Sequence, residues 1–232
     1  MPLSLVTGLA LIFLAIVLVG TYTFLPPLAE RMVARNVQEG LGLGERPQVE
    51  LQSDPLPAML AGKFSGGRVS LGDADLGVAR ADRVVVDLDP FDLDVAGSVT
   101  GGALRSESPL SGTLRAEVSE QEISQLAKAG VQDIELEEDR VLVRSEARVL
   151  GFDVPVSVQG SLILRDGALA FEPQRASALG TPVPEQLLAG ADFSYPLGRL
   201  PYGAKITGVE VGWDRLVLSG EMKRIPLNRP IG

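Results

Sequence analysis

The chain contains no cysteine and no histidine among its 232 residues. Without cysteine the protein cannot form disulfides or use a thiol nucleophile, and without histidine it lacks the commonest general base and the usual zinc ligands. Triads that depend on histidine are excluded for the same reason. Carboxylates, serine combined with lysine, and backbone groups are the only catalytic chemistry left.

Basic and aromatic residues are also scarce. Lys and Arg total 21 against 30 Asp and Glu, which gives a formal net charge of −9, and aromatic residues make up 5 %. A negative chain has little attraction for nucleic acid or for anionic lipid surfaces, so we expect no nucleic-acid partner. Hydrophobic residues nevertheless make up 45 %, with 26 Gly and 16 Pro, which is typical of many short aliphatic strands joined by turns.

The first 29 residues carry no charged side chain, and residues 3–25 are nearly all apolar. As a helix with a rise of about 1.5 Å per residue, this stretch reaches roughly 34 Å and can span a hydrocarbon core of about 30 Å. We therefore predict a membrane anchor at residues 1–27, an exported domain at 28–225 and a C-terminal tail at 226–232. The domain would then lie on the extracytoplasmic side of the cell membrane.

Two alternatives for the N-terminal segment remain open. A cleaved signal peptide would leave a secreted domain, but such peptides have a basic start, a shorter apolar run and a small-x-small cleavage site, none of which is evident before Pro26 and Pro27. A soluble core helix is the other alternative.

Helical spacing of apolar residues predicts an amphipathic helix over residues 28–41. A short helix is predicted at 55–61 and a weaker one at 184–189. Ser119 and Glu122 form a capping box that starts a further helix, which ends before Gly130.

Period-two alternation dominates the rest of the chain and predicts antiparallel strands with one polar face. It is clearest over residues 141–149 and 154–164, and Asp166 and Gly167 form a hairpin signal that leads into a strand at 169–171. Further strands are predicted at residues 47–52, 67–71, 83–89, 111–118, 131–137, 205–212 and 215–221.

An Asp-Arg pair precedes an aliphatic run three times, beginning at Asp82, Asp139 and Asp214. The last two matches extend backwards, because residues 134–136 align with 209–211 at the same offset of 75. One hairpin unit is therefore predicted to occur at least twice. The simpler alternative is that aspartate suits turns and that strands resemble one another.

Paired carboxylates are the main catalytic candidates. Asp87 with Asp89 and Asp92 with Asp94 have the i, i+2 spacing that places two side chains on one strand face, where they could hold a cation or act as acid and base. A solvated strand face explains the same spacing. We predict that the protein is not an enzyme and that it has no catalytic residue, no metal site and no cofactor.

The surplus of aliphatic residues instead suggests a groove for lipid. Each CH₂ group that leaves water contributes about 0.8 kcal/mol, so a chain of about sixteen carbons contributes roughly 12 kcal/mol before ordering costs. The candidate lining residues are Leu28, Met32, Val37, Leu56, Met59, Leu60, Phe64, Ile123, Leu126, Val156, Val158, Leu162 and Phe171. The alternative is a filled core in a structural or adaptor domain.

The order of features resembles a known family. The first amphipathic helix ends in glycines, and a strand and the run at residues 54–64 follow. Residues 116–119 then open a helix, and residues 200–203 precede two closing strands. This order, over roughly residues 28–222, resembles the LmeA-like family of exported proteins of the actinobacterial cell envelope.

The resemblance implies a fold similar to the lipid-binding module of bactericidal/permeability-increasing protein. That fold is of α+β class, with a curled antiparallel sheet wrapped on amphipathic helices. The resemblance further implies that the partner is a phospholipid or glycolipid held by its acyl chains, and that the function is envelope lipid transport or maintenance.

Overall fold

A computed structural model describes the strands of the protein and a few helical residues. The described residues are 45–53, 61–76, 79–94, 109–125, 131–149, 152–183, 193–197 and 203–225, together with Glu30, Arg31, Ala34, Arg35, Gln38, Ala58, Ser106 and Leu200. The chain divides into two compact units. Unit 1 comprises Met1–Val69, Leu88–Leu110 and Pro226–Gly232, and unit 2 comprises Ser70–Asp87 and Ser111–Ile225.

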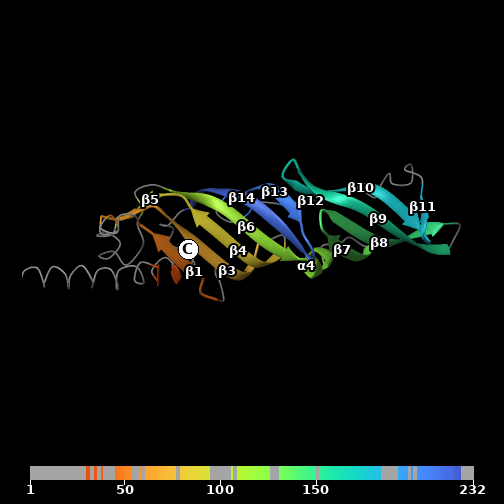
Figure 1. The fold of residues 1–232 in the computed structure, drawn as a ribbon, viewed down its shortest axis with the longest axis horizontal. Helices are drawn as coiled ribbons and strands as arrows, with labels where there is room; N and C mark the ends of the chain where they lie inside the picture. The colour runs from red at the N-terminus through yellow and green to blue at the C-terminus, as the bar shows by residue number, and fades with distance from the viewer. Residues whose placement is uncertain are drawn as a thin grey trace, which may run out of the picture. The chain divides into compact units, whose positions relative to one another are not determined.

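The described strands form two large sheets and one small one (Figure 1). The first sheet has the order β1 (Gln48–Gln52), β3 (Gly66–Asp75), β4 (Arg80–Leu88), β6 (Leu110–Ser119), β14 (Arg215–Ile225) and β13 (Lys205–Val211). The second sheet has the order β11 (Thr181–Pro182), β10 (Ala168–Ala178), β9 (Phe152–Arg165), β8 (Arg140–Val149) and β7 (Val131–Glu137), with β12 (Phe193–Pro196) also paired to β10. The third sheet pairs β2 (Lys63–Phe64) with β5 (Phe91–Asp92).

Unit 1 contains the small sheet. Phe64 of β2 stacks on its cross-strand partner Phe91, with ring centroids 5.0 Å apart, and both side chains are buried. The N–H of Leu93 donates to the carbonyl of Gly62 at 2.7 Å, which ties the ends of the two short strands together. This aromatic pair is therefore a small core of unit 1.

The second sheet belongs to unit 2 and is an antiparallel meander from β7 to β10. The predicted turn between β9 and β10 is confirmed, because Asp166 and Gly167 both have positive φ, at 50° and 75°. β10 is longer than predicted because a register shift between Pro173 and Arg175 interrupts the alternation without ending the pairing to β9.

The two hairpins of the predicted repeat lie against each other in unit 2. The N–H of Asp139 donates to the carbonyl of Val211 at 3.0 Å, and the N–H of Asp214 donates to the carbonyl of Leu136 at 3.4 Å. At the offset of 75, Asp139 and Leu136 of the first hairpin correspond to Asp214 and Val211 of the second, so each of these hydrogen bonds is the counterpart of the other. The β7–β8 and β13–β14 turns are thus related by an approximate twofold exchange. The third match differs, because Asp82 lies inside β4.

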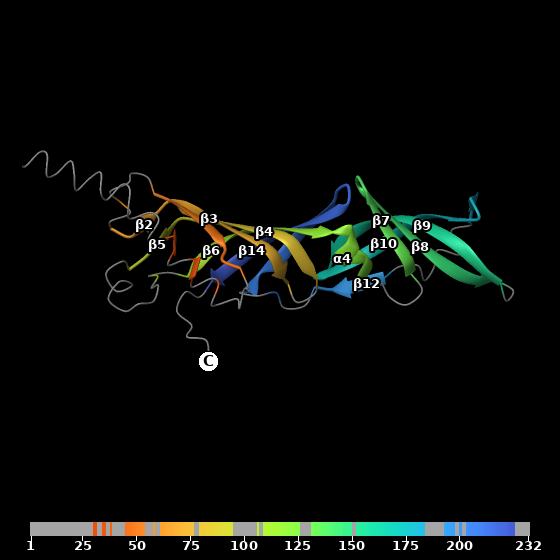
Figure 2. The ribbon, with the colours of Figure 1, turned by 90° about the horizontal axis from the view of Figure 1, so that it is seen from below.

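The helix α4 (Glu120–Gln125) covers the outer edge of β7 (Figures 1 and 2). The Glu120 carboxylate accepts the Leu136 N–H at 2.6 Å, and the Ser124 hydroxyl donates to the Ile134 carbonyl at 3.4 Å. Glu120 and Ser124, one helical turn apart, thereby hydrogen-bond to backbone groups of β7 that would otherwise be free to pair with a neighbouring strand. The helix begins directly after Ser119, as the capping box predicts.

The predicted fold class is confirmed for its antiparallel sheet. The expected wrapping of one curled sheet on amphipathic helices is not evident in the described residues, whose strands form two larger sheets and whose one described helical element is short. No helix in this part of the chain has the length and apolarity needed to cross a membrane. The predicted span at residues 3–25 and the predicted helix at 184–189 lie outside the described residues.

Candidate functional site

One side of the second sheet is apolar across four strands. Cross-strand partners in an antiparallel sheet point to the same side, so the register fixes which residues share it. The register places on one side the residues Ile134, Leu136, Val141, Val143, Val156, Val158, Leu162, Leu169 and Phe171, which we name the apolar face.

The opposite side of the sheet is polar. Arg144 of β8 forms ion pairs with Asp133 and Glu135 of β7, at 2.8 and 2.6 Å, and Arg165 pairs with Glu172 across β9 and β10. Because these groups are about half exposed, each pair contributes little to stability, on the order of 0.5 kcal/mol. The charges instead keep this side in water, which leaves the apolar face for packing or for ligand.

The centre of the apolar face is tightly packed around Phe171. Its side chain is 1 % exposed and its ring stacks on that of Phe193 in β12, with centroids 5.1 Å apart. The ring lies over Gly160 of β9, where an added Cβ would be 2.7 Å from two ring carbons. Gly160 is therefore the residue that lets the ring reach the sheet.

Burial along the apolar face decreases toward the end where β8 turns into β9. Val158 and Leu162 are 6 % and 7 % exposed, whereas Val154 and Val156 are only half-buried. Val156 pairs with Ser145 and Ala178, which are also half-buried. Protein atoms therefore cover the centre of the apolar face more completely than the end near Val156.

The structure places six of the thirteen predicted lining residues. Val156, Val158, Leu162 and Phe171 share the apolar face, and Ile123 is buried on α4, which packs against β7 of the same sheet. Phe64 belongs to the aromatic pair of unit 1. The remaining residues lie outside the described part of the chain: Leu28, Met32, Val37, Leu56, Met59, Leu60 and Leu126.

Residues of β7 and β8 on the apolar face were missed as candidates. Ile134 and Leu136 are each 2 % exposed, and Val141 is 1 % exposed. Their alternation with charged residues was visible in the sequence and predicted the strands correctly. The alternation did not predict the strand register, which places these residues on the same side of the sheet as Val158 and Leu162.

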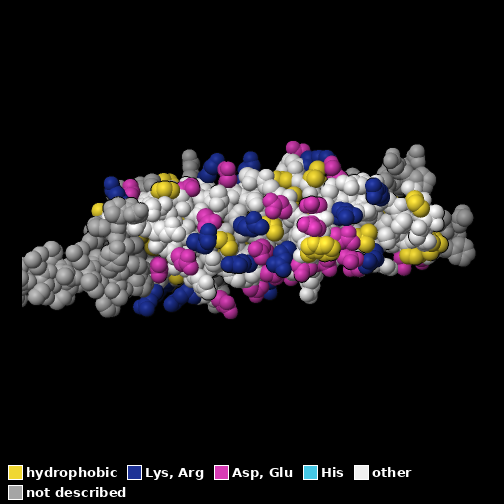
Figure 3. Space-filling view, in the orientation of Figure 1, with side chains coloured by type: hydrophobic (Ala, Val, Ile, Leu, Met, Phe, Trp, Pro, Cys, Tyr) yellow, Lys and Arg dark blue, Asp and Glu magenta, His cyan; other side chains and the backbone are white. Residues whose placement is uncertain are grey.

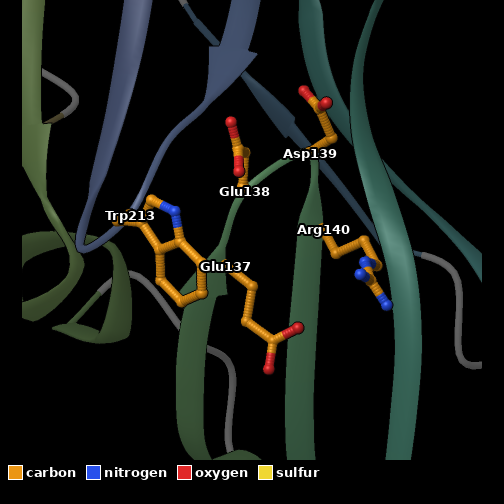
Figure 4. A pocket seen from close by; sticks show the side chains of 5 residues that line it. All are labelled: Glu137, Glu138, Asp139, Arg140 and Trp213. Carbon is orange, nitrogen blue, oxygen red and sulfur yellow. The ribbon is translucent and has the colours of Figure 1, made fainter.

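Two polar hollows flank the paired hairpin turns. One, of about 360 Å³, is lined by Glu137, Glu138, Asp139, Arg140 and Trp213 (Figure 4). The other, of about 330 Å³, is lined by Asp82, Glu117, Ser119, Glu120, Gln121, Asp214 and Arg215. A hydrogen bond to Asp214, followed by the charges of Asp214 and Glu117, raises the pKa of Arg215 above its usual value.

These hollows do not resemble a metal centre. Among the described residues, no group of three acidic side chains is arranged to hold a metal ion. Of the carboxylates considered for catalysis, Asp87, Asp89 and Asp92 are exposed, and Asp94 is half-buried. The apolar face is therefore the stronger candidate for a functional site.

A sheet with one polar side and one long apolar side, of which one end is incompletely covered, is suited to a protein that binds apolar molecules. The profile of the LmeA-like phospholipid-binding family matches residues 20–221, so the chain belongs to that family. This match confirms the resemblance predicted from the sequence. No curated protein and no solved structure matches the chain.

Proposed function

We propose that the protein is a membrane-tethered, extracytoplasmic lipid-binding protein that holds phospholipid or glycolipid acyl chains. In this proposal it takes part in lipid transport or maintenance of the cell envelope and catalyses no reaction. Membership of a phospholipid-binding family supports the ligand class. The half-buried Val156 end of the apolar face carries the proposal, because there an acyl chain can replace water against valine and alanine side chains.

The central part of the apolar face serves stability in this proposal. Val158, Leu162 and Phe171 already contact protein atoms, as their low exposure indicates. An acyl chain enters beside Val156 and extends the packed core rather than filling an empty one.

Replacing Val156 with glutamate is expected to weaken lipid binding about thirtyfold or more, because desolvating a carboxylate against an acyl chain costs roughly 2 kcal/mol or more. The full chain and its variants are purified in parallel, extracted with organic solvent and analysed by mass spectrometry. Uptake of a fluorescent fatty acid provides a second measurement.

Ser157→Glu is the matched control, since Ser157 is half-buried on the neighbouring position of β9 but points to the polar side. It should bind lipid as the native chain does. Lipid associated with residues 3–25 is common to all variants and cancels in the comparison. Equal lipid content in Val156→Glu and Ser157→Glu would refute the site and favour the filled-core adaptor role.

The proposed tether predicts that protein isolated from membranes begins at its original N-terminus and resists carbonate extraction. The reason is the apolar length of residues 3–25, which is sufficient for a transmembrane helix. N-terminal sequencing of the protein in the membrane fraction and in the soluble fraction measures this directly. A soluble protein that begins between about residues 20 and 30 would instead identify a cleaved signal peptide and a secreted lipid carrier.

A further inference from the structure

The turn between β10 and β11 has an unusual residue. Leu179 and Gly180 form a two-residue turn with φ of 51° and 76°, and Ala178 pairs with Thr181 across it. The left-handed region favours Gly, Asn and Asp and is unfavourable for leucine. In the described part of the chain, the other four non-glycine residues with positive φ are all aspartates.

Leu179 is also 76 % exposed, the highest value among the large hydrophobic side chains that the structure describes. The side chain therefore contributes little to the core, and its backbone conformation would suit asparagine or glycine better. Neither its backbone conformation nor packing against the described residues accounts for a leucine at this position. We take a contact outside the protein as the physical reason for it.

The turn and the adjoining parts of its own strands and of β9 contain no charged residue. Residues 176–183 contain no charged side chain, and neither do residues 154–164 of the neighbouring strand. The β8–β9 hairpin turns at the same end of the sheet, with Val149 opposite Phe152 as its last described pair. Figure 3 shows hydrophobic side chains at this end, near the position of β11 in Figure 1.

On β8 and β9, the exposed acidic residues close to this end of the sheet are Glu146, which lies opposite Pro155, and Asp153 near the start of β9. Ala178 is the cross-strand partner of the half-buried Val156. The exposed leucine is thus one residue beyond the incompletely covered end of the apolar face. The uncharged turn itself matches the interior of a lipid layer rather than a charged protein surface.

Trp213 provides a contrast. It is the other exposed large hydrophobic side chain among the described residues, at 66 %, but it lines a hollow together with Glu137, Glu138, Asp139 and Arg140. The charged groups of this hollow disfavour entry of the indole into a membrane, since each would lose hydration. Exposure alone is therefore a weaker indication of a lipid contact at Trp213 than exposure without charge is at the β10–β11 turn.

We propose that the turn at Leu179 inserts into the interface of a phospholipid bilayer, so that acyl chains pass between the bilayer and the apolar face beside Val156. This inference rests on the proposed lipid-binding function. The contact is apolar, because no basic residue lies in the turn and the chain carries a net charge of −9. It therefore does not require anionic lipid and persists at high salt.

The first test uses tryptophan fluorescence in vesicles of phosphatidylcholine with brominated acyl chains, which quench tryptophans that enter the bilayer. Leu179→Trp is made in a Trp213→Phe background, and the native chain, with Trp213 as its one tryptophan, is the control. We expect the introduced indole to lose about half of its emission and Trp213 to lose little, because an interfacial side chain lies about 5–10 Å deep. Equal quenching at the two positions, or none at either, would overturn the proposal.

The second test is Leu179→Asn, which should fold at least as stably because asparagine tolerates positive φ. We expect its rate of lipid transfer between phosphatidylcholine vesicles to fall about tenfold while its bound lipid is unchanged. Trp213→Asn should transfer lipid at the native rate. If Leu179→Asn transfers lipid at the native rate, the bilayer contact is refuted. It is also refuted if a partner protein buries Leu179 in the absence of vesicles.

The two proposals fail in different ways. If the native chain carries no lipid but the introduced indole is quenched, the bilayer contact stands and the lipid-binding function fails. If the native chain carries lipid but the introduced indole is not quenched, the lipid-binding function stands and the bilayer contact fails. The quenching and the lipid content are measured on the same preparations.

Discussion

Gly160→Ala is expected to lower the free energy of unfolding by about 3 kcal/mol. An alanine Cβ at this position would lie 2.3 Å from the carbonyl oxygen of Glu172 and 2.7 Å from ring carbons of Phe171. The first contact is with backbone of the paired strand β10, so it cannot be relieved by a rotamer change. The strands must separate locally, and urea unfolding followed by circular dichroism measures the cost.

Gly208→Ala is the matched control for this substitution. Gly208 also lies in a strand, but an added Cβ would meet its nearest atom, the Cβ of Ser219, at 3.8 Å, an ordinary contact. We expect its stability to change by less than about 0.5 kcal/mol. Similar losses in the two variants would show that glycine at position 160 is not needed for the approach of Phe171.

Phe171→Ala is expected to cost about 4 kcal/mol, because it removes a fully buried ring and its stacking on Phe193. Val156→Ala on the same apolar face should cost about 1 kcal/mol or less, since Val156 is only half-buried. Thermal and urea unfolding of the two variants measure the difference between the packed centre of the face and its open end.

The same pair of variants distinguishes a packed core from a ligand-binding surface on the apolar face. Added lipid should restore little stability to Phe171→Ala if protein atoms alone pack the ring. A cost below about 1 kcal/mol for Phe171→Ala would mean that the ring lines a ligand space, as predicted from sequence, rather than a filled core. That result would move the proposed acyl-chain site from Val156 toward the centre of the sheet.

Much of the second sheet could be predicted from the sequence. The alternation over residues 131–137, 141–149 and 154–164 identified three of its strands, and Asp166 with Gly167 identified the turn to the fourth. These signals are local, because each residue's side follows from its parity along the strand and each tight turn needs residues that accept positive φ.

The short strands and the site could not be predicted in the same way. β11 and β12 have only two and four residues, too few for a periodicity to show, and they form because β10 offers them a partner. The sequence predicts Val158 and Phe171 as lining residues, but protein atoms cover both side chains. Coverage depends on elements distant in sequence, which periodicity does not report.

By itself, the sequence determined the absence of thiol and imidazole chemistry, the antiparallel strands and the duplicated hairpin signal, since these depend on composition and on neighbours along the chain. The tertiary structure decided that the two hairpin turns exchange hydrogen bonds and that Phe171 lies over Gly160. It also decided that the apolar face is less completely covered near Val156, whose partner Ala178 precedes the exposed Leu179. The physical reason is that register, close approach and exposure arise only when distant segments pair, and no local pattern encodes which side chains the pairing leaves uncovered.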